Sequence, residues 1–363
     1  MARSAKVRGK IVERGSFLVL LHTPRFWYIQ KPTILARLLQ PLGWIYGLVV
    51  GWDRHRSRPM RLSVPVVSIG NITLGGTGKT PLVIALAQQL ERRGQRVAVL
   101  LRGYGTQRRS PCRVNPSHTA ADVGDEAMEL QRSLPGVPVW VGSDRVAAGR
   151  AAIAAGADLL LLDDGLQHWR LARDCDITVI EGAHGLGNGL VFPAGPLREP
   201  ACELARADLL VLTGATGGPN SAGLGVPPAW PSAKPCFPLA GWIDAPEALG
   251  GLSLLAFCGI GLPAKFFAAL RQAGFQLTAT ACFPDHHPYA QADLERLQHR
   301  ADCHSATLVT TVKDWQRLPL AWQERVVAMP LVLNPPAVAA ITDSVLRHLE
   351  GVTDIQDGGG VDG

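Results

Sequence analysis

The chain has 363 residues, of which 47% are hydrophobic and 18% charged, and its formal net charge is +6. This balance is typical of a globular protein with a sizeable core, and it excludes a fibrous or wholly disordered chain. Seven scattered cysteines without a C-x-x-C pair exclude a disulfide framework and a zinc ribbon, and they predict a reducing, cytosolic setting. The cysteines and histidines between residues 282 and 304 match no standard metal-site spacing.

The first 62 residues carry most of the positive charge, with twelve Lys and Arg side chains against two acidic ones. Within them, residues 34–52 form a nearly continuous apolar run with two tryptophans and a tyrosine, followed by arginines at 54, 56, 58 and 61. This pattern is typical of a segment that lies on an anionic membrane. A spanning helix, which needs about 20 apolar residues, and a buried core helix are the alternatives. No nucleic-acid-binding motif accompanies the basic residues, so we expect no nucleic-acid partner.

An apolar run at residues 66–70 leads into a glycine-rich loop, and an amphipathic segment follows from residue 82 to residue 90. Strand, loop and helix in this order, with Gly-Lys-Thr at the helix start, predict a phosphate-binding loop for ATP or GTP. Lys79 would reach the β- and γ-phosphates, and the Thr80 hydroxyl would bind Mg²⁺. Thr73 occupies the place of the usual first glycine. The predicted nucleotide-binding residues are Thr73, Leu74, Gly75, Gly76, Thr77, Gly78, Lys79 and Thr80.

A second buried strand is predicted at residues 96–101, and it ends in Arg-Gly-Tyr-Gly, a sequence suited to a ligand-facing loop. Asp125 then precedes a short amphipathic segment at residues 127–130. The local pattern leaves two roles open for Asp125. It is either a carboxylate that stabilises a helix N-terminus or a catalytic group.

A third strand, residues 158–162, is almost purely leucine and ends in Asp163 and Asp164. A continuous apolar run of this length is typical of a strand buried on both faces of a parallel sheet. An acidic pair after such a strand is usually a turn, but beside Lys79 and Thr80 it predicts a site for Mg²⁺ or its bound waters.

Residues 214–235 are rich in Gly, Pro and Ser and predict a linker. Alternating strand and helix patterns resume after it, which predicts a second α/β lobe. The expected organisation is a membrane-associating segment at 1–62, a nucleotide-binding core at 63–213, the linker, a smaller lobe at 236–350, and a disordered Gly- and Asp-rich tail at 351–363. The predicted fold class is α/β, with a P-loop NTPase-like parallel sheet flanked by helices.

These motifs, in this order, resemble those of the tetraacyldisaccharide 4′-kinases of lipid A biosynthesis. The resemblance covers about residues 23 to 345. One departure is Val312, where the family pattern has an acidic residue before Lys-Asp. The matching blocks are residues 68–71 (SIGN), 75–81 (GGTGKTP), 102–105 (RGYG), 123–126 (VGDE), 163–168 (DDGLQH), 193–199 (PAGPLRE), 257–263 (FCGIGLP), 283–287 (FPDHH) and 311–314 (TVKD).

The resemblance implies that the γ-phosphoryl group of ATP is transferred to the 4′-hydroxyl of a tetraacylated glucosamine disaccharide 1-phosphate, giving the 1,4′-bisphosphate lipid A precursor. The reaction would take place at the cytoplasmic face of the bacterial inner membrane, with the enzyme bound peripherally or monotopically. Because the substrate is a lipid, the apolar side chains of the N-terminal segment would lie among acyl chains while its arginines contact anionic headgroups. We expect the enzyme to be a monomer.

The resemblance also implies roles for individual residues. Asp125 and His286 would form a catalytic dyad with Lys79 nearby, and a histidine partner suits a carboxylate base. His286 is preferred to His287 because it directly follows Asp285. The remaining assignments are Arg198 and Asn71 for phosphate or substrate, and Thr80, Asp163, Asp164 and Glu199 for the metal; Gln167 and His168 receive no role.

Two other functions remain open at this point. A membrane-recruited regulatory P-loop ATPase or GTPase would share the phosphate loop and the acidic pair, although the sequence lacks the guanine-specific N-K-x-D motif. A nucleotide-regulated binding module would need no chemistry. Substitution of Asp125 separates them, because a switch keeps nucleotide hydrolysis whereas the kinase loses transfer and still binds ATP.

Overall fold

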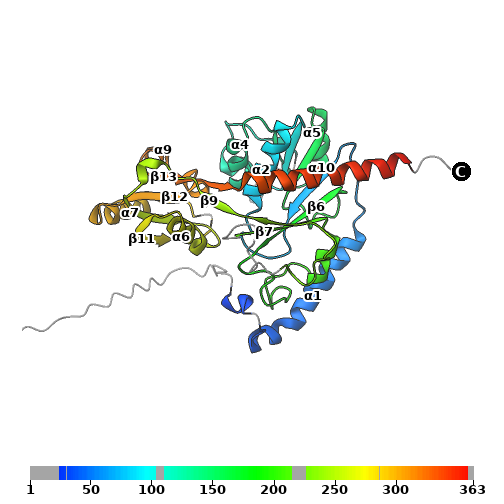
Figure 1. Cartoon of the computed structure of the whole chain (residues 1–363), viewed down its shortest axis with the longest axis horizontal. Helices are drawn as coiled ribbons and strands as arrows, with labels where there is room; N and C mark the ends of the chain where they lie inside the picture. The colour runs from blue at the N-terminus through cyan, green and yellow to red at the C-terminus, as the bar shows by residue number, and fades with distance from the viewer. Residues whose placement is uncertain (1–23, 30, 104–109, 215–225, 286, 359–363) are drawn as a thin grey trace, which may run out of the picture.

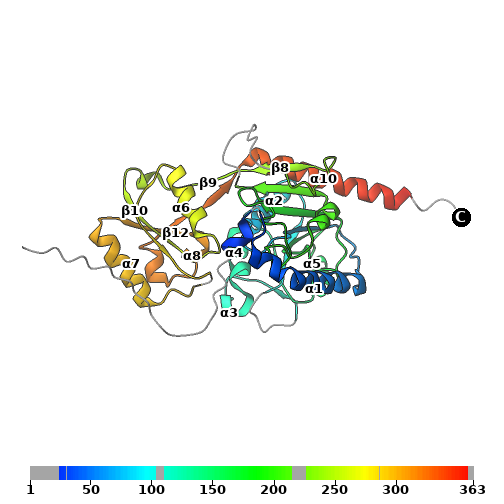
Figure 2. The same cartoon turned by 90° about the horizontal axis from the view of Figure 1, so that it is seen from below.

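The chain folds into a larger core lobe and a smaller second lobe, which lie side by side in the two orthogonal views of Figures 1 and 2. The computed structural model describes residues 24–29, 31–103, 110–214, 226–285 and 287–358. Both lobes are α/β, and the predicted fold class is confirmed.

The core lobe is built on an eight-stranded sheet with the strand order β3-β4-β2-β5-β1-β6-β7-β8. All neighbouring strands are parallel except β3 and β4, which are antiparallel. The five central strands are buried at every residue, which explains their unbroken apolar sequences. The strands are β1 (Val66–Gly70), β2 (Val97–Leu101), β3 (Cys112–Arg113), β4 (Val139–Val141), β5 (Leu159–Asp163), β6 (Cys175–Glu181), β7 (Leu209–Thr213) and β8 (Cys236–Leu239).

Helices cover both faces of this sheet, because alternate residues of each strand point to opposite sides. Val67 and Ile69 of β1 belong to the cluster that packs under α2, α4 and α10. Val66 of the same strand belongs to the cluster under α5. The core helices are α2 (Lys79–Arg92), α3 (Ala120–Val123), α4 (Asp125–Ser133), α5 (Arg145–Ala154) and α10 (Pro335–Gly358), with the short 3-10 helix η2 (Ala201–Arg206).

The second lobe has a four-stranded parallel sheet with the order β11-β10-β12-β13. One apolar cluster packs on the side of α6 and another on the side of α7 and α9. Its elements are the 3-10 helix η3 (Glu247–Leu249), β10 (Ser253–Cys258), α6 (Pro263–Gln272), β11 (Gln276–Cys282), α7 (Gln291–Cys303), β12 (Thr307–Thr311), α8 (Val312–Trp315), α9 (Leu320–Gln323) and β13 (Val327–Met329).

The boundaries of the second lobe differ from the sequence prediction of 236–350. Strand β8 extends the core sheet by pairing with β7, and a two-stranded antiparallel ribbon of β9 (Gly241–Ile243) and β14 (Leu331–Leu333) connects the lobes. After the ribbon, α10 returns along the core lobe, where its apolar side chains join the cluster of α2 (Figure 1). The second lobe is therefore an insertion between β8 and α10.

Helix α10 corrects the predicted tail at 351–363 as far as residue 358, whereas residues 359–363 lie outside the described part of the chain. The helix continues to Gly358, because a helix that is already anchored by buried side chains extends at little cost. In the predicted linker, residues 226–235 form turns around the buried Trp230, while residues 215–225 lie outside the described part of the chain.

Helix α1 (Ile34–Arg56) lies along the outside of the core lobe (Figure 2). Its inner side rests on Val191 and Phe192 and on η2: the backbone of Val191 leaves no room for a Cβ atom on Gly43, Tyr46 packs edge-on against Phe192, and Arg54 forms an ion pair with Glu203. Its outer side exposes a row of large apolar side chains, so the core-helix alternative is wrong. These side chains are Leu35, Leu38, Leu42, Trp44, Ile45, Leu48, Val49 and Trp52. Among the described residues, α1 is the one helix long and apolar enough to cross a membrane.

Candidate functional site

The glycine loop joins β1 to α2 as the sequence predicts, and two of its glycines adopt backbone angles that other residues rarely adopt. Gly75 and Gly78 have φ values of +111° and +83°, which favour glycine, and Gly78 is the residue directly before α2. The loop is supported from outside, because Leu74 N–H donates to Pro196 O at 2.7 Å and Thr213 Oγ1 donates to Thr77 O at 2.8 Å.

Lys79 is the first residue of α2, and its ammonium group is held at the mouth of the loop. Nζ lies 3.1 Å from Asn71 Oδ1 and 3.3 Å from Asp164 Oδ1. Asn71 is fully buried and also donates to Thr73 O at 2.7 Å. Asn71, which the sequence assigns to phosphate or substrate, therefore contacts the lysine and the loop itself in this structure.

The acidic pair lies beside Lys79, because β5 and β1 are parallel neighbours whose carboxyl ends meet. Thr80 Oγ1 is 3.4 Å from Asp163 Oδ2. Asp163 is 4% exposed, and this burial raises its pKa to about 7, although Lys79 opposes the rise. For Asp164, burial would raise the pKa, but the charges and hydrogen bonds of Lys79 and Arg198 outweigh it and hold the pKa below its usual value.

The two aspartates and Thr80 form a donor set that suits Mg²⁺. Hydroxyl and carboxylate oxygens are the ligands preferred by this hard cation. The raised pKa of Asp163 adds a physical reason, since a divalent cation at this carboxylate would compensate for the solvation lost on burial. The residues present therefore fit the predicted metal.

Arg198, Glu199 and Gln167 extend this cluster on the side of Asp164. Arg198 Nη1 donates to both oxygens of Asp164, at 3.1 and 3.0 Å, and to Gln167 Oε1 at 3.2 Å. Gln167 in turn donates to Glu199 Oε1 at 2.7 Å and to Asn71 O at 3.0 Å. Glu199 is 2% exposed, and Arg206 bonds both of its oxygens. These contacts favour a positioning role for Glu199 over the predicted role as a metal ligand.

Asp125 begins α4 and faces the second lobe. Its Oδ2 accepts from Arg317 Nε at 3.1 Å and lies 2.9 Å from Arg317 Nη2. His286, its predicted dyad partner, lies outside the described residues. The adjacent His287 bonds Asp293 within the second lobe, with Nε2 2.9 Å from Oδ2, and stacks on Phe283.

Val312, where the family pattern has an acidic residue, is the first residue of α8. Lys313 Nζ lies 3.5 Å from Asp285 Oδ1. Asp314 is fully buried and pairs with Arg317 at 3.4 Å. Lys313 and Asp314 thus both form ion pairs in this chain, which has Val at position 312.

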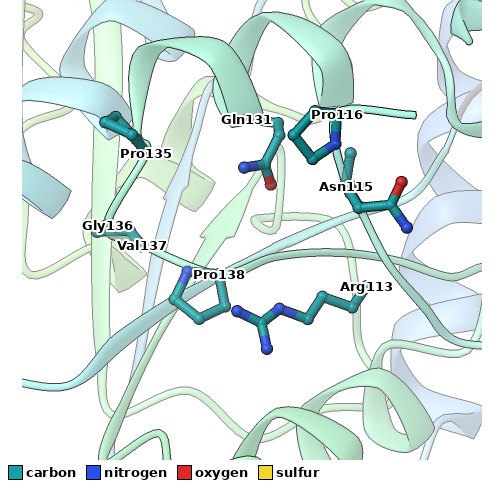
Figure 3. A pocket seen from close by; sticks show the side chains of 9 residues that line it. Arg113, Asn115, Pro116, Gln131, Pro135, Gly136, Val137 and Pro138 are labelled. Carbon is teal, nitrogen blue, oxygen red and sulfur yellow. The ribbon is translucent and has the colours of Figure 1, made fainter. Parts of the chain in front are cut away.

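The second lobe approaches the glycine loop on its other side. A Cβ atom on Gly261 would lie 3.9 Å from Gly76 N, and Lys265 Nζ forms an ion pair with Glu181 Oε1 at 3.1 Å. The space beside the loop is small, about 10 Å³, and Tyr28 and His184 line it. A larger cavity of about 190 Å³ lies away from this site, between Arg113, Gln131 and Pro138 (Figure 3).

Two functional candidates escaped the sequence analysis. Arg317 was missed because it lies three residues beyond a recognised block, although it contacts Asp125. Arg145 was missed because it begins the alanine-rich helix α5, which carries no recognised motif, yet it is 3% exposed and its Nη2 donates to Asp163 O at 3.5 Å. Burial, then the charge of Arg102, lower the pKa of Arg145 to about 10. Burial and Arg145 lower the pKa of His168 to about 4, so His168 is neutral at physiological pH.

Comparison with known proteins agrees with this arrangement. The family model described as tetraacyldisaccharide-1-P 4′-kinase matches residues 35–350. The chain belongs to this family. It is thus an ATP-dependent kinase that acts on the 4′-hydroxyl of a tetraacyldisaccharide in lipid A biosynthesis.

Similar proteins cover nearly the whole chain. It is 43% identical to a tetraacyldisaccharide 4′-kinase of Gluconacetobacter diazotrophicus, over 86% of this chain and 94% of that protein. Its identity to the Maricaulis maris enzyme of the same name is also 43%, over 90% and 96%. Among solved structures, the kinase of this family from Aquifex aeolicus, in complex with ATP, superposes with a TM-score of 0.71 at 27% identity, covering 87% of this chain and all of that one.

Proposed function

We propose that the 4′-kinase reaction takes place between the two lobes, with Asp125 as the base that accepts the proton of the 4′-hydroxyl and His286 as its partner. The proposal is supported by three observations: Lys79 and Thr80 contact the acidic pair at the glycine loop, Gly261 of the second lobe approaches this loop, and Asp125 contacts Arg317 of the second lobe. The ATP complex of the Aquifex aeolicus relative supports ATP as the nucleotide.

In the proposed reaction, the 4′-oxygen forms a bond to the γ-phosphorus as the bond from that phosphorus to the β,γ-bridging oxygen breaks. The hydroxyl proton passes to Asp125, and the products are the 4′-phosphate monoester and ADP. Lys79 and the amides of residues 75–80 neutralise the charge that develops on the phosphoryl oxygens. Bound Mg²⁺ at Thr80, Asp163 and Asp164 would supply further neutralisation. Asn71 and Arg198 hold Lys79 and Asp164 in place.

The lipid substrate is reached through α1. Its outer apolar row and the arginines that follow it suit the boundary between acyl chains and anionic headgroups. The helix is docked on the core lobe from Gly43 to Arg54, so one side cannot face lipid. We therefore propose that α1 lies in the cytoplasmic interface of the inner membrane and does not span it. Since one chain supplies both lobes of the site, we propose a monomer.

The test is transfer of labelled γ-phosphate from ATP to tetraacyldisaccharide 1-phosphate in mixed micelles. We expect Asp125→Asn and His286→Ala to lower kcat by about 100-fold or more, because a positioned base contributes 10²–10⁴-fold. The matched control is His287→Ala, which removes the neighbouring imidazole and should retain transfer. Lipid-independent ATP hydrolysis that survives Asp125→Asn, with no transfer by the wild type, would reject this proposal in favour of the regulatory ATPase.

A further inference from the structure

We propose that Arg317 is a positioning residue that orients Asp125 for catalysis and ties this orientation to contact between the two lobes. The inference rests on the proposed role of Asp125 as the base. Arg317 follows α8 in the second lobe, whereas Asp125 begins α4 in the core lobe, and 192 residues separate them. Their contact therefore exists only when the lobes meet.

The guanidinium group of Arg317 is fixed from within its own lobe. Its side chain is 7% exposed, and Nη1 lies 3.4 Å from Oδ1 of the fully buried Asp314. Asp314 Oδ2 accepts from Gly259 N–H at 3.0 Å and from Thr311 Oγ1 at 2.7 Å. Gly259 opens the turn that reaches the glycine loop at Gly261. One buried carboxylate thus anchors both the guanidinium and this turn.

The fixed guanidinium then holds the base through two nitrogens. Nε and Nη2 lie 3.1 and 2.9 Å from the same oxygen, Asp125 Oδ2. Two donors from a rigid planar group fix the position of this oxygen more closely than a single flexible ammonium would. A base whose proton-accepting atom is displaced by about 1 Å loses about 100-fold in rate, so this restriction matters for kcat.

The charge of Arg317 adds a second effect that a merely structural contact lacks. A cation next to a carboxylate favours the ionised form and so lowers the pKa of the carboxyl group. Removal of the cation should raise this pKa by about one unit or more. The acid limb of the pH–rate profile should therefore report whether Arg317 acts on the base. Another ion pair between the lobes, Lys265 with Glu181 at 3.1 Å, has a similar length and joins residues other than Asp125, so it supplies the matched control.

The experiment measures phosphoryl transfer in mixed micelles between pH 3 and 9, a range that includes the usual pKa of an aspartate, about 3.9, for the full-length wild type, Arg317→Gln, Arg317→Lys and Lys265→Gln. We expect Arg317→Gln to lower kcat by about 10- to 100-fold, to leave KM for ATP within about threefold, and to move the acid limb up by about one pH unit. Arg317→Lys should restore the position of the limb and only part of kcat. Lys265→Gln should leave the limb where it is.

An acid limb that stays in place in Arg317→Gln, with a loss of kcat no larger than in Lys265→Gln, would overturn the inference. If Arg317→Gln does not fold, because Asp314 loses its cation, Arg317→Lys decides: lowered kcat at an unchanged KM supports the inference and wild-type kcat refutes it. Asp125→Asn, measured alongside, separates the two proposals. If Asp125→Asn retains transfer, the assigned base is wrong; if only the Arg317 variants behave as wild type, the proposed function stands and this inference fails.

Discussion

Replacing Asp163 by Asn should stabilise the metal-free protein while abolishing transfer. Burial raises the pKa of Asp163 from 3.8 to about 7. Between these values the folded protein holds a proton that the unfolded chain has lost, so stability falls as pH rises through this range. A rise of about 3 pKa units corresponds to about 4 kcal/mol at pH 8, at about 1.4 kcal/mol for each unit. Asn keeps the shape of the side chain without the charge.

The assay is urea denaturation without Mg²⁺, in which unfolding is monitored by circular dichroism. We expect Asp163→Asn to gain about 4 kcal/mol in unfolding free energy at pH 8 and about half of this at pH 5.5, where the wild-type carboxyl keeps its proton when folded. The neighbouring Asp164 gives a control of opposite sign. Its pKa is lowered by Lys79 and Arg198 against the effect of burial, so its charge stabilises the fold above the unfolded pKa, and Asp164→Asn should destabilise.

A variant Asp163→Asn that is no more stable than the wild type at pH 8 would refute this reasoning. It would mean that the buried carboxylate is already compensated without a cation. The argument that burial prepares Asp163 for Mg²⁺ would then lose its support.

Three further predictions concern α1 and Glu199. Leu48→Asp should weaken sedimentation with anionic liposomes without lowering stability, because Leu48 is 74% exposed; unchanged binding would argue against the interfacial helix. Gly43→Val should release α1 to proteolysis, because its Cβ would lie 2.8 Å from the Val191 carbonyl, whereas Gly47→Val meets nothing within 4 Å and should not. Glu199→Gln should lower kcat without raising the Mg²⁺ concentration for half-maximal activity; a raised requirement would restore Glu199 as a metal ligand.

The parts of the site that could be predicted are those where local sequence determines geometry. A strand, a glycine loop and a helix place Lys79 and Thr80 without help from the rest of the chain. Asp163 could be added because parallel strands present their carboxyl ends at one edge of a sheet. The same rule does not give the order of strands, so the sequence alone could not show that β5 lies directly beside β1.

Contacts between distant segments could not be predicted in this way. Arg317 contacts Asp125 because of how the two lobes are placed relative to each other. The hydrophobic pattern of a sequence predicts local helices and strands, but it does not predict the distance between residues in different lobes. The predicted boundaries of the second lobe were wrong for a related reason. Strand β8 has four residues and includes a proline, and only its hydrogen bonds to β7 show that it belongs to the core sheet. The apolar stripe of α10 predicts that one side of this helix is buried, but it does not predict which helix it packs against.

The return of α10 to the core lobe has a consequence for how the protein is made. During synthesis, the second lobe leaves the ribosome before α10, so it can form its own sheet while the core still lacks a helix over α2. Val338, Ile341 and Val345 fill that face only afterwards. The nucleotide-binding lobe, although it begins first in the chain, is thus completed last. A nascent chain halted within the second lobe would expose the apolar surface of α2 to chaperones, and phosphate transfer would await the final helix.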